Sequence, residues 1–545
     1  MNASLAETPP GAAATHAEPS GSDMRLIIGA SAAGTVFEWY DFFIYGTLGA
    51  ILSKTFFPTG NATLEMLLFW LVFAVGFGFR PLGAVLFGFL GDRLGRKYTF
   101  LVTVMLMGVA TAGVGMVPSA ETIGWWAPAL VILLRVLQGL ALGGEYGGAA
   151  VYVAEHAPFA KRGYFTSYIQ AGVVGGFVLS LMVVLACKAA MPADTWAAWG
   201  WRVPFLLSFV LLAISLWMRL KLSESPVFLE MQEEGEIAGN PFVESFTYPG
   251  NKRRIFVALF GIAAGLTVIF YTAMFSGMGF LKSAMHMDDT AAELIAGVSA
   301  LFGMGFFVLF GHLSDRWGRK RSVVLGYGLT LLLLFPAYWL MGAAGERAGG
   351  DVAWTIAGPD CSYDAFATVQ HTQCGKLMGD FTGAGIAYRL AKAPVLALSA
   401  GERPVDLAGL DWADAKARKV EIEARTGIPV FTAPKVKPGL RQMLLTGAAM
   451  MLMMLLSGMT FGPVAALLAE MFPARVRYSS MSIPYHIGTG YFGGFQPLIA
   501  TYIVAKTGNP FSGLWYTWVV VLMAFLVSLW GLKGGPPQDF ADDVD

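Results

Sequence analysis

The chain has 545 residues, with 37 basic and 37 acidic side chains, and 56% of its residues are hydrophobic. Only 14% are charged, compared with about 25% in soluble domains, so the composition indicates a polytopic membrane protein rather than a soluble one. The net charge of zero gives no electrostatic reason to expect a nucleic acid or an acidic partner.

The first 24 residues, MNASLAETPPGAAATHAEPSGSDM, have neither a basic start nor an apolar core. They therefore do not read as a signal peptide. Their composition is that of a segment without a packed core, and we expect residues 1–24 to be a disordered cytoplasmic tail.

Twelve apolar runs follow, each about long enough for a membrane-spanning helix of roughly 20 residues. They lie near residues 26–52, 65–89, 98–117, 128–151, 165–187 and 201–220 and, after a polar gap, near 255–281, 294–312, 322–341, 440–468, 480–506 and 512–531. The predicted fold is all-α, with 12 transmembrane helices in two pseudo-symmetric six-helix bundles.

Lysine and arginine mark the cytoplasmic loops of membrane proteins. They gather here in the loops after helices two, four, eight and ten, with three in 93–97 and four in 316–321. This distribution predicts that both termini and the middle gap are cytoplasmic, in a multi-pass protein of the inner, or plasma, membrane.

Two motifs occur once in each half of the chain. GFLGDRLGRK at 88–97 matches GHLSDRWGRK at 311–320, and AEHAPFAKR at 154–162 matches AEMFPARVR at 469–477. The first pair is offset by 223 residues and the second by 315, so the second half contains about 92 extra residues between these landmarks. The polar stretch at 343–438 accounts for them.

The expected organisation follows from these boundaries. It consists of a tail at 1–24, a six-helix bundle at 25–222, a cytoplasmic linker at 223–254, helices seven to nine at 255–342, an external insertion at 343–438, helices ten to twelve at 439–532 and a cytoplasmic tail at 533–545.

The insertion is the least informative part of the sequence. Residues 409–427 favour one short amphipathic helix. Cys361 and Cys374 lie on the side where disulfides persist if that compartment is oxidising, so they form either a bridge or two unpaired thiols.

The duplicated motifs predict a conformational latch. Glycine allows a tight turn and close helix approach, and an aspartate beside an arginine can make charge-assisted hydrogen bonds that form in one conformation and break in another. The alternative is that the basic residues signal topology alone. The predicted latch residues are Gly88, Asp92, Arg93, Gly95, Arg96, Gly311, Asp315, Arg316, Gly318, Arg319, Glu155, Arg162, Glu470 and Arg477.

Together these motifs resemble the major facilitator superfamily. FEWYDFFIYG at 37–46, RPLGAVLFGFLGDRLGRK at 80–97 and RVLQGLALGGEYGG at 135–148 are similar to its metabolite:H+ symporter branch, and AEMFPARVR resembles the related sugar porters. The resemblance spans about 25–342 and 439–532 and excludes the insertion. It implies import of dicarboxylates, shikimate-like acids, citrate, or proline and betaine, driven by protons.

Two acids lie inside the first apolar run. Ionisable groups within the membrane are costly and usually mark an ion or substrate path. Glu38 and Asp41 are three residues apart and Tyr45 follows four later, so the three share one helix face. Two close carboxylates should not both stay charged in a poorly hydrated site, so one is expected to carry a proton.

Arg80 and Arg135 supply the opposite charge. The family resemblance implies that Asp41 faces Arg135, which would hold an anionic substrate whenever Asp41 is protonated. The alternatives are a static Asp41–Arg135 pair, a Glu38 beside a solvated vestibule, and an Arg80 that snorkels to the interface. The proton-coupling prediction comprises Asp41, Glu38, Arg135 and Glu145, with a purely structural hydrogen bond as the alternative for Glu145.

The expected substrate contacts are Arg80, Arg135, Tyr45, Gln138, Tyr271 and Gln496. No Walker loop and no Cys/His cluster with metal-ligand spacing is present, so protons rather than ATP, a metal or another cofactor are expected to drive the cycle. No catalytic constellation indicates an enzyme.

The predicted function is proton-coupled symport of a small metabolite, with an organic acid favoured by the two inward cations. The expected partners are that metabolite, protons and the lipid bilayer, without nucleic acid, and the protein is expected to be a monomer. Open alternatives are a proline- or betaine-type zwitterion symporter, a drug/H+ antiporter and a transporter-like receptor. The antiporter is disfavoured because residues 170–181 lack a Gly-Pro pair.

Overall fold

The computed structural model describes residues 21–94, 96–144, 146–220, 241–345, 352–473 and 476–535. Both ends of the chain and most of the predicted linker therefore lie outside the described residues. The side chains of some predicted site residues also lie outside the described part: those at the latch positions Gly88, Asp92, Arg93, Gly95 and Arg96 and at the coupling residue Glu145. Their predicted roles stay predictions.

The first half of the chain forms six helical spans. Asn61 begins the second span, since its side chain accepts hydrogen bonds from the amides of Thr63 and Leu64. Short helices connect the spans: α2 (Gly49–Phe56), α6 (Ala120–Ile123) and α10 (Ala193–Ala198). The spans are α1 (Gly21–Thr47), α3 (Ala62–Gly78) with α4 (Arg80–Leu94), α5 (Arg96–Met116), α7 (Trp126–Gly143) with α8 (Tyr146–His156), α9 (Arg162–Ala190), and α11 (Val203–Leu206) with α12 (Ser208–Leu220).

The second half repeats this pattern after α14 (Pro241–Thr247). Its seventh and eleventh spans contain π-helical stretches, η3 (Val257–Ala263), η4 (Thr272–Ser276) and η6 (Gly488–Gly494). The helices of the six spans are α15 (Asn251–Phe256), α16 (Ala264–Tyr271) and α17 (Gly277–Lys282); α18 (Asp289–Trp317); α19 (Arg319–Ala344); α22 (Leu440–Phe461) and α23 (Val464–Met471); α24 (Arg477–Ile487) and α25 (Gln496–Thr507); and α26 (Leu514–Gly531).

Nine helical spans within the described residues are long and apolar enough to cross a membrane. Large apolar side chains on them face outward, as at Phe302, Leu332 and Trp339, which are 61%, 70% and 63% exposed. The first, third and eleventh spans are not among the nine; the third is apolar, but its described apolar stretch, Leu101–Met116, is shorter than 18 residues. This pattern is that of a protein surrounded by lipid.

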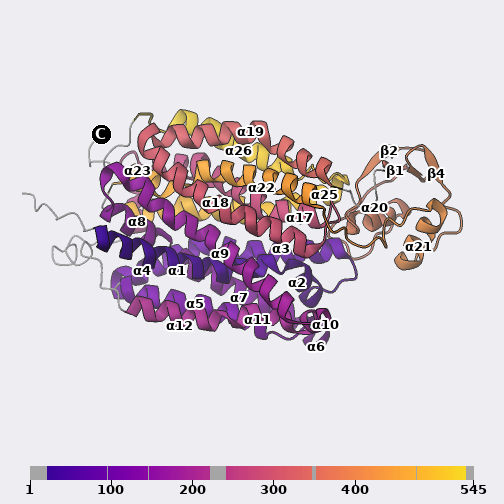
Figure 1. Ribbon diagram of the computed structural model, residues 1–545, viewed down its shortest axis with the longest axis horizontal. Helices are drawn as coiled ribbons and strands as arrows, with labels where there is room; N and C mark the ends of the chain where they lie inside the picture. Colours follow the sequence, from indigo (N-terminus) through magenta and orange to yellow (C-terminus); the bar gives the residue numbers. More distant parts are fainter. Residues whose placement is uncertain are drawn as a thin grey trace, which may run out of the picture.

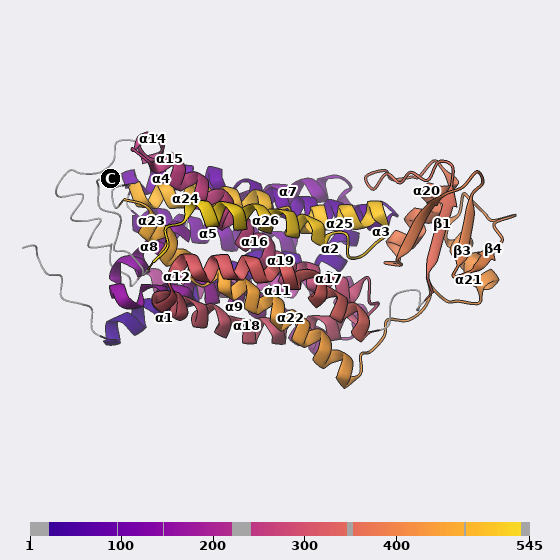
Figure 2. The same ribbon diagram turned by 90° about the horizontal axis from the view of Figure 1, so that it is seen from above.

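The helices run along the long axis of the molecule, and a small α/β unit projects beyond one end of them (Figure 1). We call this unit, residues 352–438, the inserted domain, and the end of the helices beside it the insert end. The other end carries the duplicated motifs, near α8 and α23, and is called the latch end (Figure 2).

The inserted domain contains a four-stranded sheet in the order β2-β1-β3-β4, in which β1 and β2 are parallel. The predicted helix at 409–427 is present as α21, and a disulfide joins Cys361 to Cys374. The sheet was not predicted from the sequence. Its elements are β1 (Trp354–Gly358), α20 (Gln373–Gly383), β2 (Tyr388–Lys392), β3 (Ala397–Ala400), β4 (Arg403–Val405) and α21 (Ala415–Thr426).

The two halves meet along two edges. On one edge α9 of the first half packs against α18 of the second, and on the other α3 packs against η6 and α25. A layer of aromatic rings lies between the halves, where Phe43 and Phe73 of the first half contact Tyr271 and Phe275 of the second. The candidate site lies on the first-half side of this layer.

Candidate substrate and proton site

The two acids of α1 are buried within the first half. Glu38 and Asp41 are 8% and 6% exposed. They line a small cavity between α1, α5 and α12, together with Met107, Leu212 and Ser215 among others. The predicted common face of the two acids is therefore present, and both lie away from bulk solvent.

Arg135 is completely buried and surrounded by aromatic rings. Its guanidinium carbon lies 4.2 Å from the ring centroid of Phe42, 4.6 Å from that of Tyr45 and 5.4 Å from that of Phe73. Such rings attract a cation through their negative faces but cannot accept its hydrogen bonds in the way a carboxylate does. The predicted contact residue Tyr45 thus reaches Arg135, and its own ring stacks on Phe69.

Arg80 is also completely buried, at the start of α4, and does not snorkel to the interface. Its guanidinium carbon lies 4.7 Å from the ring centroid of Phe77, 4.9 Å from that of Trp39 and 5.6 Å from that of Phe42. Phe42 therefore contacts both guanidinium groups, so Arg80 and Arg135 are neighbours within one set of aromatic rings, which we call the arginine pocket.

Glycines allow α7 to lie directly against α3 and α4. A Cβ added at Gly139 would collide with the carbonyl oxygen of Gly76, and one added at Gly143 would collide with that of Arg80. Only glycine permits this backbone approach. The close crossing brings Arg135 on α7 beside Arg80 on α4.

A hydrogen-bond chain links Arg135 to the first helix. Nη1 of Arg135 donates to Gln138 over 2.7 Å, and the amide nitrogen of Gln138 donates to the hydroxyl of Thr111 over 2.7 Å. The Thr111 hydroxyl donates to the carbonyl of Met107 and, over 3.5 Å, to the backbone carbonyl of Asp41. Among the described ion pairs there is none between Asp41 and Arg135, so the predicted couple is not in direct contact in this conformation.

The second half contributes Tyr271 to the aromatic layer. Its ring centroid lies 5.4 Å from that of Phe77, which also contacts Arg80. The other predicted contact, Gln496, is buried and hydrogen-bonds with the hydroxyl of Ser276 over 2.9 Å. Of the two, only Tyr271 is placed at the arginine pocket by the contacts described.

At the latch end, Asp315, the aspartate of the GHLSDRWGRK motif, caps a helix of the other half. The carboxylate of Asp315 accepts the backbone N–H groups of Gly163 and Tyr164, each over 2.8 Å, at the start of α9. These amides are unsatisfied within the helix, and its dipole favours a negative charge there. Asp315 also pairs with Arg319 over 2.7 Å.

The acids and arginines of the two copies AEHAPFAKR and AEMFPARVR form ion pairs across the halves. Glu470 pairs with Arg162 over 3.5 Å and with Arg319 over 2.9 Å, and Arg477 pairs with Glu155 over 2.9 Å. Each half thus gives one acid and one arginine to the other. The latch end is closed in this structure.

Two other predicted latch residues have different positions. Gly318 has a φ of 91° and ends α18, as its predicted turn requires. Arg316 is exposed and does not join the ion pairs of the described residues.

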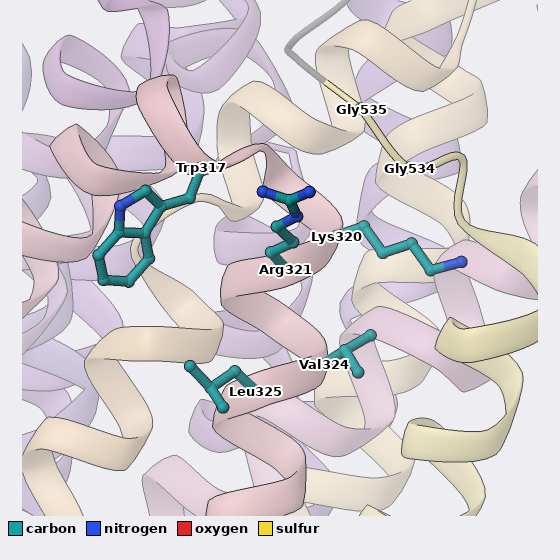
Figure 3. A pocket seen from close by; sticks show the side chains of 7 residues that line it. All are labelled: Trp317, Lys320, Arg321, Val324, Leu325, Gly534 and Gly535. Carbon is teal, nitrogen blue, oxygen red and sulfur yellow. The ribbon is translucent and has the colours of Figure 1, made fainter.

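A larger pocket, of about 730 Å3, lies outside this network. It is on the surface near the start of α19, lined by Trp317, Lys320, Arg321, Val324, Leu325, Gly534 and Gly535 (Figure 3). Lys320 donates to the carbonyls of Leu529 and Leu532 at the end of α26. This pocket shares no residue with the arginine pocket.

Two features of polar chemistry were not predicted from the sequence. Thr111 was not singled out, because a threonine in an apolar helix carries no distinguishing signal. Glu293 is only 2% exposed and binds Lys188 and Lys282, each over 2.7 Å. An acid directly before the eighth apolar run was a visible signal for this second case. The described residues contain no group of His, Cys, Asp and Glu side chains that could hold a metal ion.

Comparisons with known proteins agree with this architecture. The family model described as "Sugar (and other) transporter" matches residues 26–243. The shikimate transporter of Escherichia coli K12 is 36% identical over 373 residues, which cover 66% of this chain and 83% of that protein. The α-ketoglutarate permease of the same organism is 35% identical over 312 residues, 57% of this chain and 70% of the permease.

Further relatives extend this range. The proline/betaine transporter of Escherichia coli K12 is 34% identical over 325 residues, which cover 58% of this chain and 65% of that transporter. A solved structure of the major facilitator superfamily proton:xylose symporter XylE, bound to 6-bromo-6-deoxy-D-glucose, covers 94% of this chain and 96% of its own, with a TM-score of 0.59 and 16% identity. The structural likeness concerns the fold alone.

Proposed function

The chain belongs to the major facilitator superfamily as a sugar-transporter-like permease, and from this premise we propose that it imports a small organic acid together with protons. It is a multi-pass membrane transporter and not an enzyme. The substrate, the coupling ion, the inner-membrane location and the cytoplasmic termini belong to the proposal.

One observation carries the choice of an anion. Within the described residues, Nε and Nη2 of the fully buried Arg135 have no hydrogen-bond partner. Unsatisfied buried charged donors are costly, and they usually have a functional explanation. A substrate carboxylate would accept both N–H groups in the planar geometry that guanidinium favours. Arg80, on the other side of Phe42, adds a second positive charge.

Coupling to protons is supported by the acids of α1. Glu38 and Asp41 share one buried cavity, where two negative charges are unfavourable and one proton is expected to be held. The chain from Arg135 through Gln138 and Thr111 reaches the backbone of Asp41. Protonation of Asp41 would therefore change the position of α1 against the arginine pocket, which couples the two sites without a direct ion pair.

The latch supports alternating access. The cross-half pairs at the latch end must break for that end to open, and the two helical halves can then rock about the aromatic layer. In this cycle the substrate enters from the insert end, and release at the latch end follows the breaking of these pairs.

A zwitterion remains the second candidate, because one relative is a proline/betaine transporter and Glu38 and Asp41 could bind a cationic group. The distinguishing experiment uses purified protein and a panel of shikimate, α-ketoglutarate, proline and glycine betaine. An organic acid of the panel should raise the thermal stability of the protein most, and the same acid should be taken up into proteoliposomes under an inward proton gradient. Selection of proline or betaine would overturn the organic-acid assignment, and binding without uptake would indicate a receptor.

A further inference from the structure

The insert end has an ion triad that joins the two halves. Glu293 on α18 is bound by Lys282 of its own half and by Lys188 on α9 of the other half. The carboxylate is nearly buried, so removing Lys188 would leave a poorly solvated charge with one partner fewer. The triad therefore closes the α9–α18 edge at the end opposite to the latch.

The inserted domain closes the other edge. In both views α3 and α25 end beside it (Figures 1 and 2). Leu67 of α3 and Leu498 and Ala505 of α25 belong to the same hydrophobic cluster as the core of the domain. The domain thus covers the line along which α3 of the first half meets α25 of the second.

Most of its polar attachments are to the second half. Backbone hydrogen bonds join Val436 to His286 and Asp288, over 2.8 and 2.9 Å, in the loop between α17 and α18. Near the end of α25, the amide of Tyr388 donates to the carbonyl of Gly508 over 3.1 Å, and Lys506 donates to the carbonyl of Tyr363.

The attachment to the first half is much weaker. The side-chain amide of Asn61 donates to the carbonyl of Ala367 over 3.4 Å, beside the apolar contact of Leu67. Tyr363 of the domain also lies beside Thr63 and Asn61 of the first half. Among the described residues these contacts join uncharged groups, so they can separate without leaving a buried charge. The domain is thus fixed on the second half and rests on α3.

We propose that the inserted domain and the Lys188–Glu293–Lys282 triad together form the gate of the insert end. When this end opens, Lys188 leaves Glu293 on one edge, and the domain, moving with the second half, lifts from α3 on the other. This proposal rests on the alternating access of the proposed function, but its first test measures distances and not transport.

The test uses full-length protein in lipid nanodiscs with Cys187→Ser, so that only introduced cysteines carry spin labels while Cys361 and Cys374 stay bridged. One label pair, on Met116→Cys and Val369→Cys, spans the first half and the domain. The other pair, on Leu440→Cys and Val369→Cys, spans the second half and the domain. All three positions are exposed, by 64%, 61% and 73% for Met116, Val369 and Leu440.

Glu293→Gln should weaken the triad and add a longer component to the 116–369 distances, while the 440–369 distances stay unchanged. The matched control is Glu421→Gln, which removes an exposed ion pair inside the domain and should change neither pair. Unchanged 116–369 distances in a folded Glu293→Gln protein, or equal changes in both pairs, would overturn the proposal.

A cross-linking measurement covers the case in which Glu293→Gln does not fold. A short thiol cross-linker between cysteines at 61 and 367 ties the domain to the first half and should lower uptake of the acid selected from the panel at least about tenfold, whereas one between 363 and 506 ties it to its own half and should leave uptake intact. Equal uptake in both would refute the gate. If no panel compound is transported by the uncross-linked protein, the proposed function fails, and the distance test still decides on the gate.

Discussion

Arg135 donates to Gln138 over 2.7 Å, one helical turn further along α7, and both side chains are completely buried. This bond satisfies one edge of the guanidinium and orients the remaining N–H groups. It also connects the cation to Thr111 on α5 and, through it, to the backbone of α1. The pair is the junction between the predicted anion site and the predicted proton site.

Replacing Arg135 with lysine should weaken binding of the organic acid by about 10- to 100-fold, because an ammonium keeps the charge but loses the planar pair of donors, and hydrogen bonds to charged groups contribute about 1.5–3 kcal/mol. Titration of purified protein with the acid selected from the panel measures this effect. Arg321→Lys, at an exposed position, is the control. Equal affinities in the Arg135→Lys and wild-type proteins would exclude Arg135 as the carboxylate site.

Thr111→Val should destabilise the protein by about 1–3 kcal/mol, because the amide of Gln138 loses its acceptor in a buried place. Thermal unfolding in detergent gives the comparison. In the control Thr330→Val the lost hydroxyl donates only to a carbonyl of its own helix, so the cost should be smaller. If the two variants lose the same stability, the Arg135–Gln138–Thr111 chain has no special role in packing.

Glu470→Gln should favour opening of the latch end. Glu470 pairs with Arg162 of the other half and with Arg319, and breaking a buried pair costs about 3–5 kcal/mol. The closed state should therefore lose population, which a thiol reagent reports through faster labelling of a cysteine placed at Ser167, a buried position where α9 meets α18. Labelling at the wild-type rate would argue against the latch.

Removing the disulfide should destabilise the inserted domain specifically. Cys361 and Cys374 are 13 residues apart, and a closed loop of this size contributes about 3 kcal/mol by restricting the unfolded chain. Paired Cys361→Ser and Cys374→Ser changes should speed proteolysis within 352–438 and spare the helices. Cys187→Ser should leave the digestion pattern unchanged, and protection equal to wild type in the double variant would contradict the prediction.

The pH dependence of the inserted domain gives a further check. Backbone N–H groups of Ala413 and Asp414 hold the pKa of Asp411 below its usual range. A carboxyl with a lowered folded pKa stabilises the fold above the unfolded pKa near 3.9, and this contribution is lost as pH falls through the folded value. Asp411→Asn should therefore reduce the loss of domain stability that occurs below about pH 4. If the variant loses the same stability in acid as the wild-type protein, Asp411 is not the source of this pH dependence.

The sequence was sufficient for the helical membrane fold with its duplicated halves, because these follow from apolar length and from repeated motifs. It also singled out Glu155, Arg162, Glu470 and Arg477 as latch residues, since each copy carries one acid and one arginine, but it did not predict which of them pair. In each case the signal lies within a short stretch of chain.

The remaining features depend on packing between distant segments. Helical spacing placed Glu38 and Asp41 on one face of α1, but it could not give the rotation of α7 against α1. It therefore could not show that Gln138, rather than Asp41, accepts a hydrogen bond from Arg135. The strands of the inserted domain are three to five residues long, too short for a clear alternating pattern. Lys188 and Glu293, which form an ion pair, are 105 residues apart in the sequence.

Proton movement during substrate entry is the most direct test of the account. Proteoliposomes in weakly buffered medium, without an imposed gradient, receive the acid selected from the panel while an electrode follows external pH. Wild-type protein should make the medium more alkaline as the acid enters, and Asp41→Asn should exchange labelled acid without any pH change. Entry of the acid into wild-type vesicles with no change in external pH would contradict proton-coupled import.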